Sequence, residues 1–209
     1  MNKSICALVH RPGSTREAFQ RYYEENHVPL AIGLFPFSAY VRNHLVDPGE
    51  FGWDTISEFW ADDIARAAAL MDGPVGDTMR ADEVRFMDQS RIAPGSADET
   101  ILSQGARADA EGRRTALLVA ADDAQGDVTS IARAWAASLA ADRAGVSLDI
   151  VTAWQTPAFP AAAVIWLPGW DEPPAAPAGL SVRGLRARRI ETPTSALLSQ
   201  AGGGTACAN

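Results

Sequence analysis

The sequence predicts an α+β protein made of two ferredoxin-like repeats of the β-α-β-β-α-β type, whose sheets pack against each other. Three observations predict this class. Apolar runs and helical patterns follow in the order β-α-β-β-α-β over residues 1–92. A degenerate copy, without its second helix, follows over residues 113–195. A four-stranded sheet with helices on one face also leaves its other face bare, and two such sheets can bury these faces together.

The first half opens with a short apolar strand at residues 5–9 and a capped helix. The helix is expected to start at Ser14, which forms a capping box with Glu17 three residues later. Pro29 lacks an amide proton and favours an extended residue before it, so we expect the helix to end near His27. This end places an imidazole at the edge of a structural element.

The remaining elements of the first half follow from alternation and composition. Residues 38–46 and 53–60 alternate as strands do, and residues 62–71 form an alanine-rich helix that ends at a Gly-Pro pair. A short helical turn at residues 78–83 and a fourth strand at residues 84–88 complete the predicted unit.

The second half is predicted to repeat this order more loosely. Residues 93–112 are polar and poor in aromatic side chains, which is typical of a linker. Residues 196–209 are rich in glycine near their end, and we expect them to be disordered. The elements predicted between them are strands at 115–121, 147–157, 163–167 and 180–191 and a helix at 127–144.

Composition narrows the classes of partner and compartment. The chain has 209 residues, a net charge of -8 and an isoelectric point near 4.8. Such an acidic protein is a poor partner for nucleic acid or anionic membranes. No apolar run reaches the roughly 18 residues of a membrane helix, and no secretory leader is recognisable at the start. We therefore expect a cytoplasmic protein in which Cys6 and Cys207 form no disulfide.

Residues 3–92, approximately, contain an ordered set of motif residues. They are Phe19, Tyr22, His27, Pro29 and Leu30, then Tyr40 and Asn43, then Glu58, Phe59 and Trp60, then Asp82, Glu83, Phe86 and Asp88. In this order the first half resembles the EthD family of dimeric α+β-barrel proteins. The resemblance implies sheets that pair into an α+β barrel with a pocket inside. Relatives of this kind include dehydratases, decarboxylases and cyclases of aromatic polyketides and lactone isomerases, all without cofactors, so the fold transfers better than the reaction.

The resemblance also implies two catalytic residues. In catalytic relatives the histidine corresponding to His27 is the candidate for proton transfer, and the tyrosine corresponding to Tyr40 lines the pocket. Histidine suits general acid–base work near neutral pH, and a tyrosine hydroxyl can donate to a substrate carbonyl. A structural histidine and an ordinary strand tyrosine remain the alternatives. The substrate-binding candidates are Phe19, Tyr23, Asn43, Glu58, Phe59, Trp60 and Phe86.

Core packing explains the aromatic candidates as well as a pocket wall does. Alternation along residues 38–46 places Asn43 on the opposite face from Tyr40, so the two line one pocket only if a bulge intervenes. The three histidines, His10, His27 and His44, fall in different elements. Without metal-ligand spacing or a glycine-rich phosphate loop, we expect no metal and no cofactor.

The second half contains no histidine, because none lies beyond His44. We therefore expect one site per chain, with the second repeat as a built-in partner sheet. The chain would then be a pseudo-dimer, with a homodimer of such chains left open. The predicted function is that of a cofactor-independent lyase or isomerase of the dehydratase, cyclase or lactone-isomerase type. Its substrate would be a small apolar aromatic, polyketide-like or lactone compound, with His27 as general acid or base. A cofactor-free monooxygenase of a phenolic substrate and a non-catalytic apolar-ligand-binding or accessory protein are the alternatives.

Overall fold

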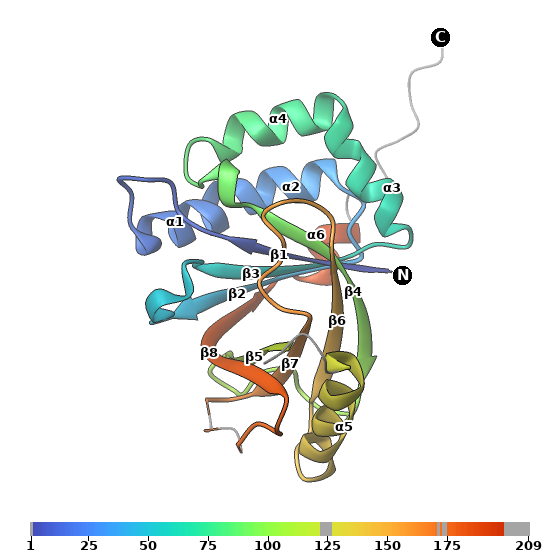
Figure 1. Ribbon diagram of the computed structural model, residues 1–209. Coiled ribbons are helices and arrows are strands. Elements are labelled where there is room, and N and C mark those ends of the chain that lie inside the picture. The colour runs from blue at the N-terminus through green and yellow to red at the C-terminus, as the bar shows by residue number, and fades with distance from the viewer. Residues whose placement is uncertain (1, 122–126, 171, 173–174, 199–209) are drawn as a thin grey trace.

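In the part of the chain that the structure describes, eight antiparallel strands form a closed barrel (Figure 1). The computed structural model describes residues 2–121, 127–170, 172 and 175–198. The predicted α+β barrel is confirmed. Around the barrel the strand order is β1-β3-β2-β8-β5-β7-β6-β4. The strands are β1 (Lys3–Leu8), β2 (Ala39–Val46), β3 (Thr55–Trp60), β4 (Ala93–Ile101), β5 (Arg113–Ala121), β6 (Ser147–Ala153), β7 (Ala163–Pro168) and β8 (Leu180–Glu191).

Each half of the chain contributes four neighbouring strands to the barrel. Across both halves the order is the same, namely last strand, first, third and second: β4-β1-β3-β2 and β8-β5-β7-β6. Two seams, β2 with β8 and β4 with β6, join the halves. Between β7 and β8 the described residues hold no helix, whereas both crossovers of the first half are helical. That the halves are copies of one repeat stays a prediction.

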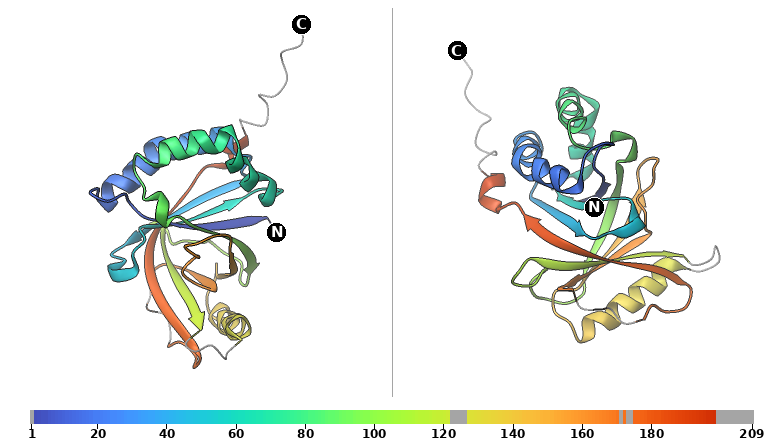
Figure 2. Two further views of the ribbon diagram at one scale, coloured as in Figure 1. Left: turned by 45° about the horizontal axis from the view of Figure 1, so that its top comes forward. Right: turned by 90° about the vertical axis from the view of Figure 1, so that its left-hand side faces the viewer.

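The helices cover the outside of the barrel on two opposite sides (Figure 2). Those of the first half lie together over β1, β2 and β3, and α5 lies over β5, β6 and β7. Short 3-10 turns occupy residues 49–51, 70–72 and 89–91. The helices are α1 (Arg16–Tyr22), a π turn (Tyr23–His27), α2 (Val28–Leu34), α3 (Ile64–Ala69), α4 (Pro74–Glu83), α5 (Val128–Ala141) and α6 (Thr194–Leu198).

The first helical segment does not end at His27, which corrects the sequence prediction. It widens into the π turn, in which the Val28 amide donates to the Tyr23 carbonyl, and continues as α2 with Pro29 in its first turn. Proline breaks a helix because its ring clashes with the carbonyl four residues back, and a widened turn relieves that clash. The N-cap is also shifted by one residue, because the Thr15 hydroxyl, not Ser14, accepts from the Ala18 amide at 3.2 Å.

The predicted fourth strand and linker are wrong. Residues 84–88 carry only an isolated bridge between His10 and Met87, and the fourth strand is Ala93–Ile101, inside the predicted 93–112 linker. Its sequence, APGSADETI, is poor in the β-branched and aromatic residues typical of strands. Pairing with both β1 and β6 nevertheless satisfies its backbone. The first nine residues of the predicted linker are therefore part of the barrel.

Two further predictions meet different outcomes. The turn expected at residues 78–83 is the end of a longer helix, α4, which begins at Pro74 because proline is favoured in a first turn. The predicted disordered tail, 196–209, begins within α6, and from residue 199 onward it lies outside the described residues.

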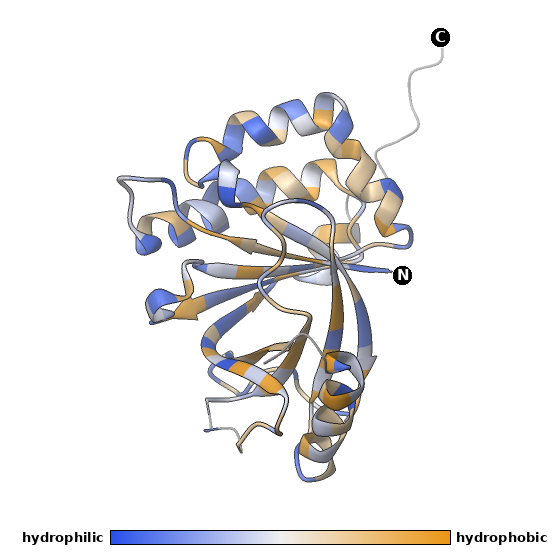
Figure 3. Cartoon of the chain, in the orientation of Figure 1, coloured by the Kyte–Doolittle hydropathy of each residue, from blue (hydrophilic) through white to orange (hydrophobic). Residues whose placement is uncertain are grey.

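Apolar side chains form one core inside the barrel and others under the helices. Hydrophobic and hydrophilic positions alternate along the strands (Figure 3), so each strand can face both layers. The interior core includes Ile5, Ile56 and Trp166, all fully buried. None of the described helices is both long and apolar enough to cross a membrane.

Candidate functional site

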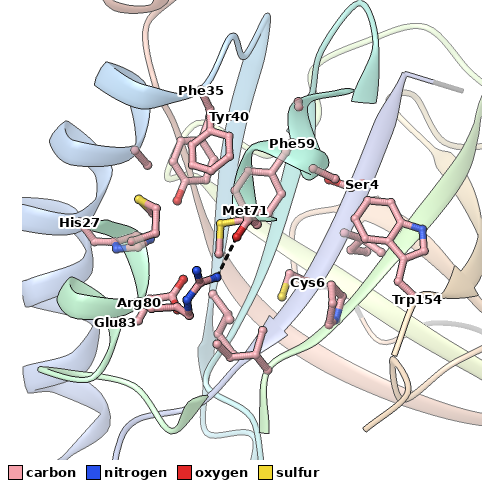
Figure 4. A pocket seen from close by; sticks show the side chains of 18 of the residues that line it. Ser4, Cys6, His27, Phe35, Tyr40, Phe59, Met71, Arg80, Glu83 and Trp154 are labelled. Atoms are coloured by element: carbon pink, nitrogen blue, oxygen red, sulfur yellow. Dashed lines mark hydrogen bonds between the residues drawn. The ribbon is translucent and has the colours of Figure 1, made fainter. Parts of the chain in front are cut away.

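A cavity of about 560 Å³ lies between the helices of the first half and the outer faces of β1, β2 and β3 (Figure 4). The expected pocket inside the barrel is therefore not where the cavity lies, because core side chains and a charged network fill that interior. Most of the cavity wall is apolar. Its apolar members are Ile5, Leu8, Ala31, Phe35, Phe37, Phe59, Ile64, Ala67, Ala68, Met71, Met79, Met87, Ile92, Pro94 and Trp154.

His27 lines this cavity from the π turn and is nearly buried. Its Nδ1 lies 2.9 Å from Oδ2 of Asp82, on α4, and the Tyr22 hydroxyl donates to Oδ1 of the same carboxylate at 2.8 Å. The rings of Tyr23 and Phe86 pack against the imidazole at centroid distances of 5.0 and 5.1 Å. The ring of His27 is thus fixed by one carboxylate and two aromatic faces.

The pKa values of two neighbouring carboxyl groups on α4 are shifted in opposite directions. The hydrogen bond with His27, helped by Tyr22, holds the pKa of Asp82 below its ordinary value. Glu83 lines the cavity, and burial raises its pKa although Gln89 donates to it at 3.3 Å. Asp82 is therefore the ionised partner of the imidazole, and Glu83 is the carboxyl that holds its proton more readily.

Tyr40 reaches the cavity from β2 and belongs to a chain of hydroxyl groups. Its hydroxyl donates to the Tyr23 hydroxyl at 2.8 Å, and the Tyr23 hydroxyl is 2.8 Å from Oγ of Ser57. Burial raises the pKa of Tyr40 well above its ordinary value. The group therefore stays a neutral hydroxyl, which can donate a hydrogen bond but does not act as a base.

An aromatic wall continues from Tyr40 along the sheet. The rings of Tyr40 and Phe59 stack with centroids 4.8 Å apart and planes inclined at 27°. Phe37 packs on both, at 5.4 and 5.2 Å, and stacks on Phe35 at 5.1 Å. A flat apolar ligand would meet ring faces along this side of the cavity.

Only some of the predicted site residues line the cavity. His27, Tyr40, Tyr23 and Phe59 do so. Phe19 and Phe86 lie behind them in the core, where their rings stack at 5.4 Å. These two support the site but are not lining residues, because α1 packs against the turn that follows α4 and puts their rings against each other.

Asn43, Glu58 and Trp60 do not line this cavity, so their role as substrate-binding residues stays a prediction that the cavity does not support. No bulge interrupts β2, so Asn43 points into the barrel, where it donates to Oε1 of Glu58 at 2.8 Å. Trp60 donates to Glu99 at 3.1 Å. Side chains alternate strictly between the two faces of these paired strands, and only those on the outer face can reach the cavity.

A charged network fills part of the barrel interior around Lys3. Its ammonium group contacts Glu58 and Asp149 at 2.7 Å each and Glu99 at 3.2 Å, and Arg114 also pairs with Glu58. Although burial opposes a charge here, the attraction of Asp149 and Glu58 raises the pKa of Lys3 above its ordinary value. Because strands from both halves contribute to it, the network ties the two halves together.

The structure also reveals site residues that sequence reasoning did not assign to a role. Asp82 and Glu83 were visible only as motif positions, because the partner of Asp82 lies 55 residues away. Met71 and Trp154 gave no signal at all. Cys6 lines the cavity too, but burial raises the pKa of its thiol, so it is not an activated nucleophile. In the described residues no cluster of three or more His, Cys, Asp or Glu side chains could hold a metal ion.

Fold and site together define an α+β-barrel protein with an apolar pocket under a helical layer and a carboxylate-bound histidine at its wall. Residues 11–90 match the family model of the EthD domain. The predicted resemblance of the first half to the EthD family is confirmed over these residues. No curated protein matches the sequence.

Solved structures show likeness at low sequence identity. An EthD family protein from Bacillus halodurans C-125 is 20% identical, with 45% of this chain and 94% of that chain covered and a TM-score of 0.36. A proposed chlorite dismutase is 9% identical, with 94% and 96% covered and a TM-score of 0.49. An anthrone oxidase-like protein is 11% identical, with 91% and 93% covered and a TM-score of 0.51. This last likeness extends over most of both chains and concerns the fold.

Proposed function

We propose that the protein is a cofactor-independent lyase or isomerase that moves a proton next to the carbonyl group of a small apolar substrate. The observation that carries this proposal is the hydrogen bond between His27 and Asp82 at the wall of an apolar cavity. Dehydration, cyclisation and lactone isomerisation of aromatic or polyketide-like compounds all begin with such a proton removal. These reactions therefore form the proposed class.

The carboxylate of Asp82 decides which nitrogen of His27 can act. Its lowered pKa keeps it ionised, and an ionised carboxylate only accepts hydrogen bonds, so Nδ1 of His27 must donate. In the neutral ring Nε2 is then the basic nitrogen. Nε2 is the atom that would take the substrate proton.

Two other groups would complete the reaction. The neutral Tyr40 hydroxyl can turn from Tyr23 to the substrate oxygen and stabilise the negative charge that develops there. The Glu83 carboxyl, with its raised pKa, can give a proton to a different carbon in an isomerisation. His27 would then release its proton to solvent and Glu83 would take one up, which restores both groups. The apolar walls would exclude water and strengthen both interactions.

A second candidate, a cofactor-free monooxygenase of a phenolic substrate, is favoured by the overall likeness to the anthrone oxidase-like structure. The same base would remove a proton from the substrate, and the resulting carbanion or phenolate would react with O₂. For anthrone, one O₂ would give anthraquinone and one water. Oxygen uptake separates this candidate from the first.

The proposal can be tested without knowing the natural substrate. In D₂O, proton removal next to a carbonyl appears by NMR as loss of the CH₂ signal of 2-tetralone. Wild-type protein should accelerate this exchange, and His27→Ala should lower the acceleration by about 10²-fold or more. The matched control is His10→Ala, since His10 lies outside the cavity lining and is hydrogen-bonded to Asp54. Exchange by His27→Ala within a few-fold of wild type would overturn the proposal.

A further inference from the structure

The second half of the chain supplies part of the cavity wall. Trp154 and Gln155 line it, although every other described lining residue belongs to residues 4–94. In Figure 4 the indole of Trp154 lies on the side opposite His27, with Ser4 and Cys6 between them. The half that lacks a histidine therefore contributes an aromatic ring to the same cavity.

Trp154 is held in place by contacts across the seam between β4 and β6. Its amide donates to the carbonyl of Pro94 at 3.1 Å, and the Gln155 side chain donates to the carbonyl of Ile92 at 3.1 Å. Further along the same loop, Phe159 is buried in the barrel core. β4 and β6 approach each other closely at this seam, because Gly95 has no side chain. A Cβ on Gly95 would come within 2.8 Å of the Thr152 carbonyl oxygen. The backbone of Trp154 is thus fixed beside the cavity wall.

Trp154 is only partly covered by the protein. The residue is 43% exposed, and among the exposed large hydrophobic residues of the described chain it alone lines the cavity. A flat apolar group that covers an exposed aromatic face binds with favourable free energy from two sources, the burial of apolar surface and the stacking of the rings. The aromatic wall of Tyr40 and Phe59 lies nearer to His27 (Figure 4). A ligand that meets both needs more than one ring.

We propose that Trp154 forms a stacking subsite for the end of the ligand opposite the reacting carbonyl. The protein would then prefer flat, elongated, multi-ring ketones to single-ring ones. The assignment of the reacting end rests on the proposed function, but the stacking itself does not. In this arrangement the first half performs the chemistry and the second half selects substrate length.

Isothermal titration with three ketones of increasing length tests the subsite. The probes are acetophenone, 2-acetylnaphthalene and 2-acetylanthracene. Trp154→Ala should weaken binding of 2-acetylanthracene about five- to tenfold and leave acetophenone within twofold. Trp154→Phe keeps a ring and should stay within about threefold for all three probes. Ile101→Ala is the matched control, because Ile101 is an exposed apolar residue outside the cavity lining and should change nothing.

Two outcomes would overturn the subsite. One is unchanged binding of the three-ring ketone by Trp154→Ala, and the other is an equal loss for all three ketones. The same titration in His27→Ala separates this proposal from the proposed function. If His27→Ala still prefers the longer ketones but catalyses exchange at the wild-type rate, the proposed function is refuted and the Trp154 subsite is retained. If His27→Ala loses exchange activity and binding does not depend on ketone length, only the Trp154 subsite is refuted.

Discussion

Nδ1 of His27 lies 2.9 Å from Oδ2 of Asp82, and this hydrogen bond joins the π turn of the first crossover to the end of α4 in the second crossover. The two elements are neighbours only because β1 and β2 pair on either side of β3. The Tyr22 hydroxyl binds the second oxygen of the same carboxylate at 2.8 Å. Asp82 therefore orients the imidazole from a position that substrate does not need to touch.

Asp82→Asn should impair catalysis through His27 without changing ligand affinity. An amide can donate as well as accept, so it no longer forces Nδ1 of His27 to carry the proton. We expect the 2-tetralone exchange rate to fall by about 10–100-fold, with the dissociation constant of 2-acetylnaphthalene within twofold of wild type. Asp77→Asn, at an exposed position on the same helix, is the control. A matching loss of affinity would mean that Asp82 only maintains the shape of the cavity.

Tyr40→Phe and Tyr23→Phe should have unequal effects on rate. Both remove one hydroxyl from the same buried chain, and each should cost about 1 kcal/mol of stability. Only Tyr40→Phe removes a group that can donate to the substrate oxygen, so its exchange rate should fall about 10²-fold. Tyr23→Phe leaves that hydroxyl in place and should stay within a few-fold. Equal rates in the two variants would count against Tyr40 as the donor.

Glu83→Gln should stabilise the protein at neutral pH. Burial raises the pKa of Glu83 in the folded chain, whereas an unfolded glutamate titrates near about pH 4.3. The folded state therefore holds this proton more tightly, and its contribution to stability is lost as pH rises from about 4.3 through the folded pKa. Glutamine stays neutral and escapes that loss. Urea unfolding at pH 7 and pH 4 should show a gain for Glu83→Gln at pH 7 that disappears at pH 4.

Lys3→Met should destabilise the barrel strongly. It leaves Glu58 and Asp149 buried with less compensating charge, and breaking a buried pair in this way costs about 3–5 kcal/mol. Glu99→Gln alters the third and less buried partner of the same ammonium group and should cost at most about 1 kcal/mol. Urea unfolding at pH 7 compares the two. A cost below about 1 kcal/mol for Lys3→Met would show that the interior carboxylates find other partners.

The parts of the fold that have periodic, apolar sequences could be predicted. Residues 38–46 alternate as a strand does, and residues 180–191 follow the element order of the first half. They are β2 and β8 to within one residue at each end. The strand at Ala93–Ile101 could not be found, because its small polar residues are held by two partner strands and not by their own propensity. Local patterns carry no information about such non-local pairing.

Only the part of the candidate site that the first half contributes could be predicted from the sequence. His27, Tyr40, Tyr23 and Phe59 line the cavity as the sequence suggested. Trp154 could not be placed there, because only the β4–β6 seam brings it next to Pro94. Alternation already set Asn43 opposite Tyr40, and the structure keeps that separation by leaving β2 unbulged.

The π turn has a consequence for how this helix can change over evolution. Each residue of an α-helix advances the side chain by about 100°, so one residue added or removed before His27 would rotate it away from Asp82. The wide turn absorbs one such residue and lets Arg16–Tyr22 and Val28–Leu34 keep separate phases. A lineage that lost Glu25, which is exposed, would keep its helices and its aromatic core but would lose the register of the imidazole. Alignment gaps at this turn would therefore distinguish chains that retain the histidine in position from chains that merely retain the residue.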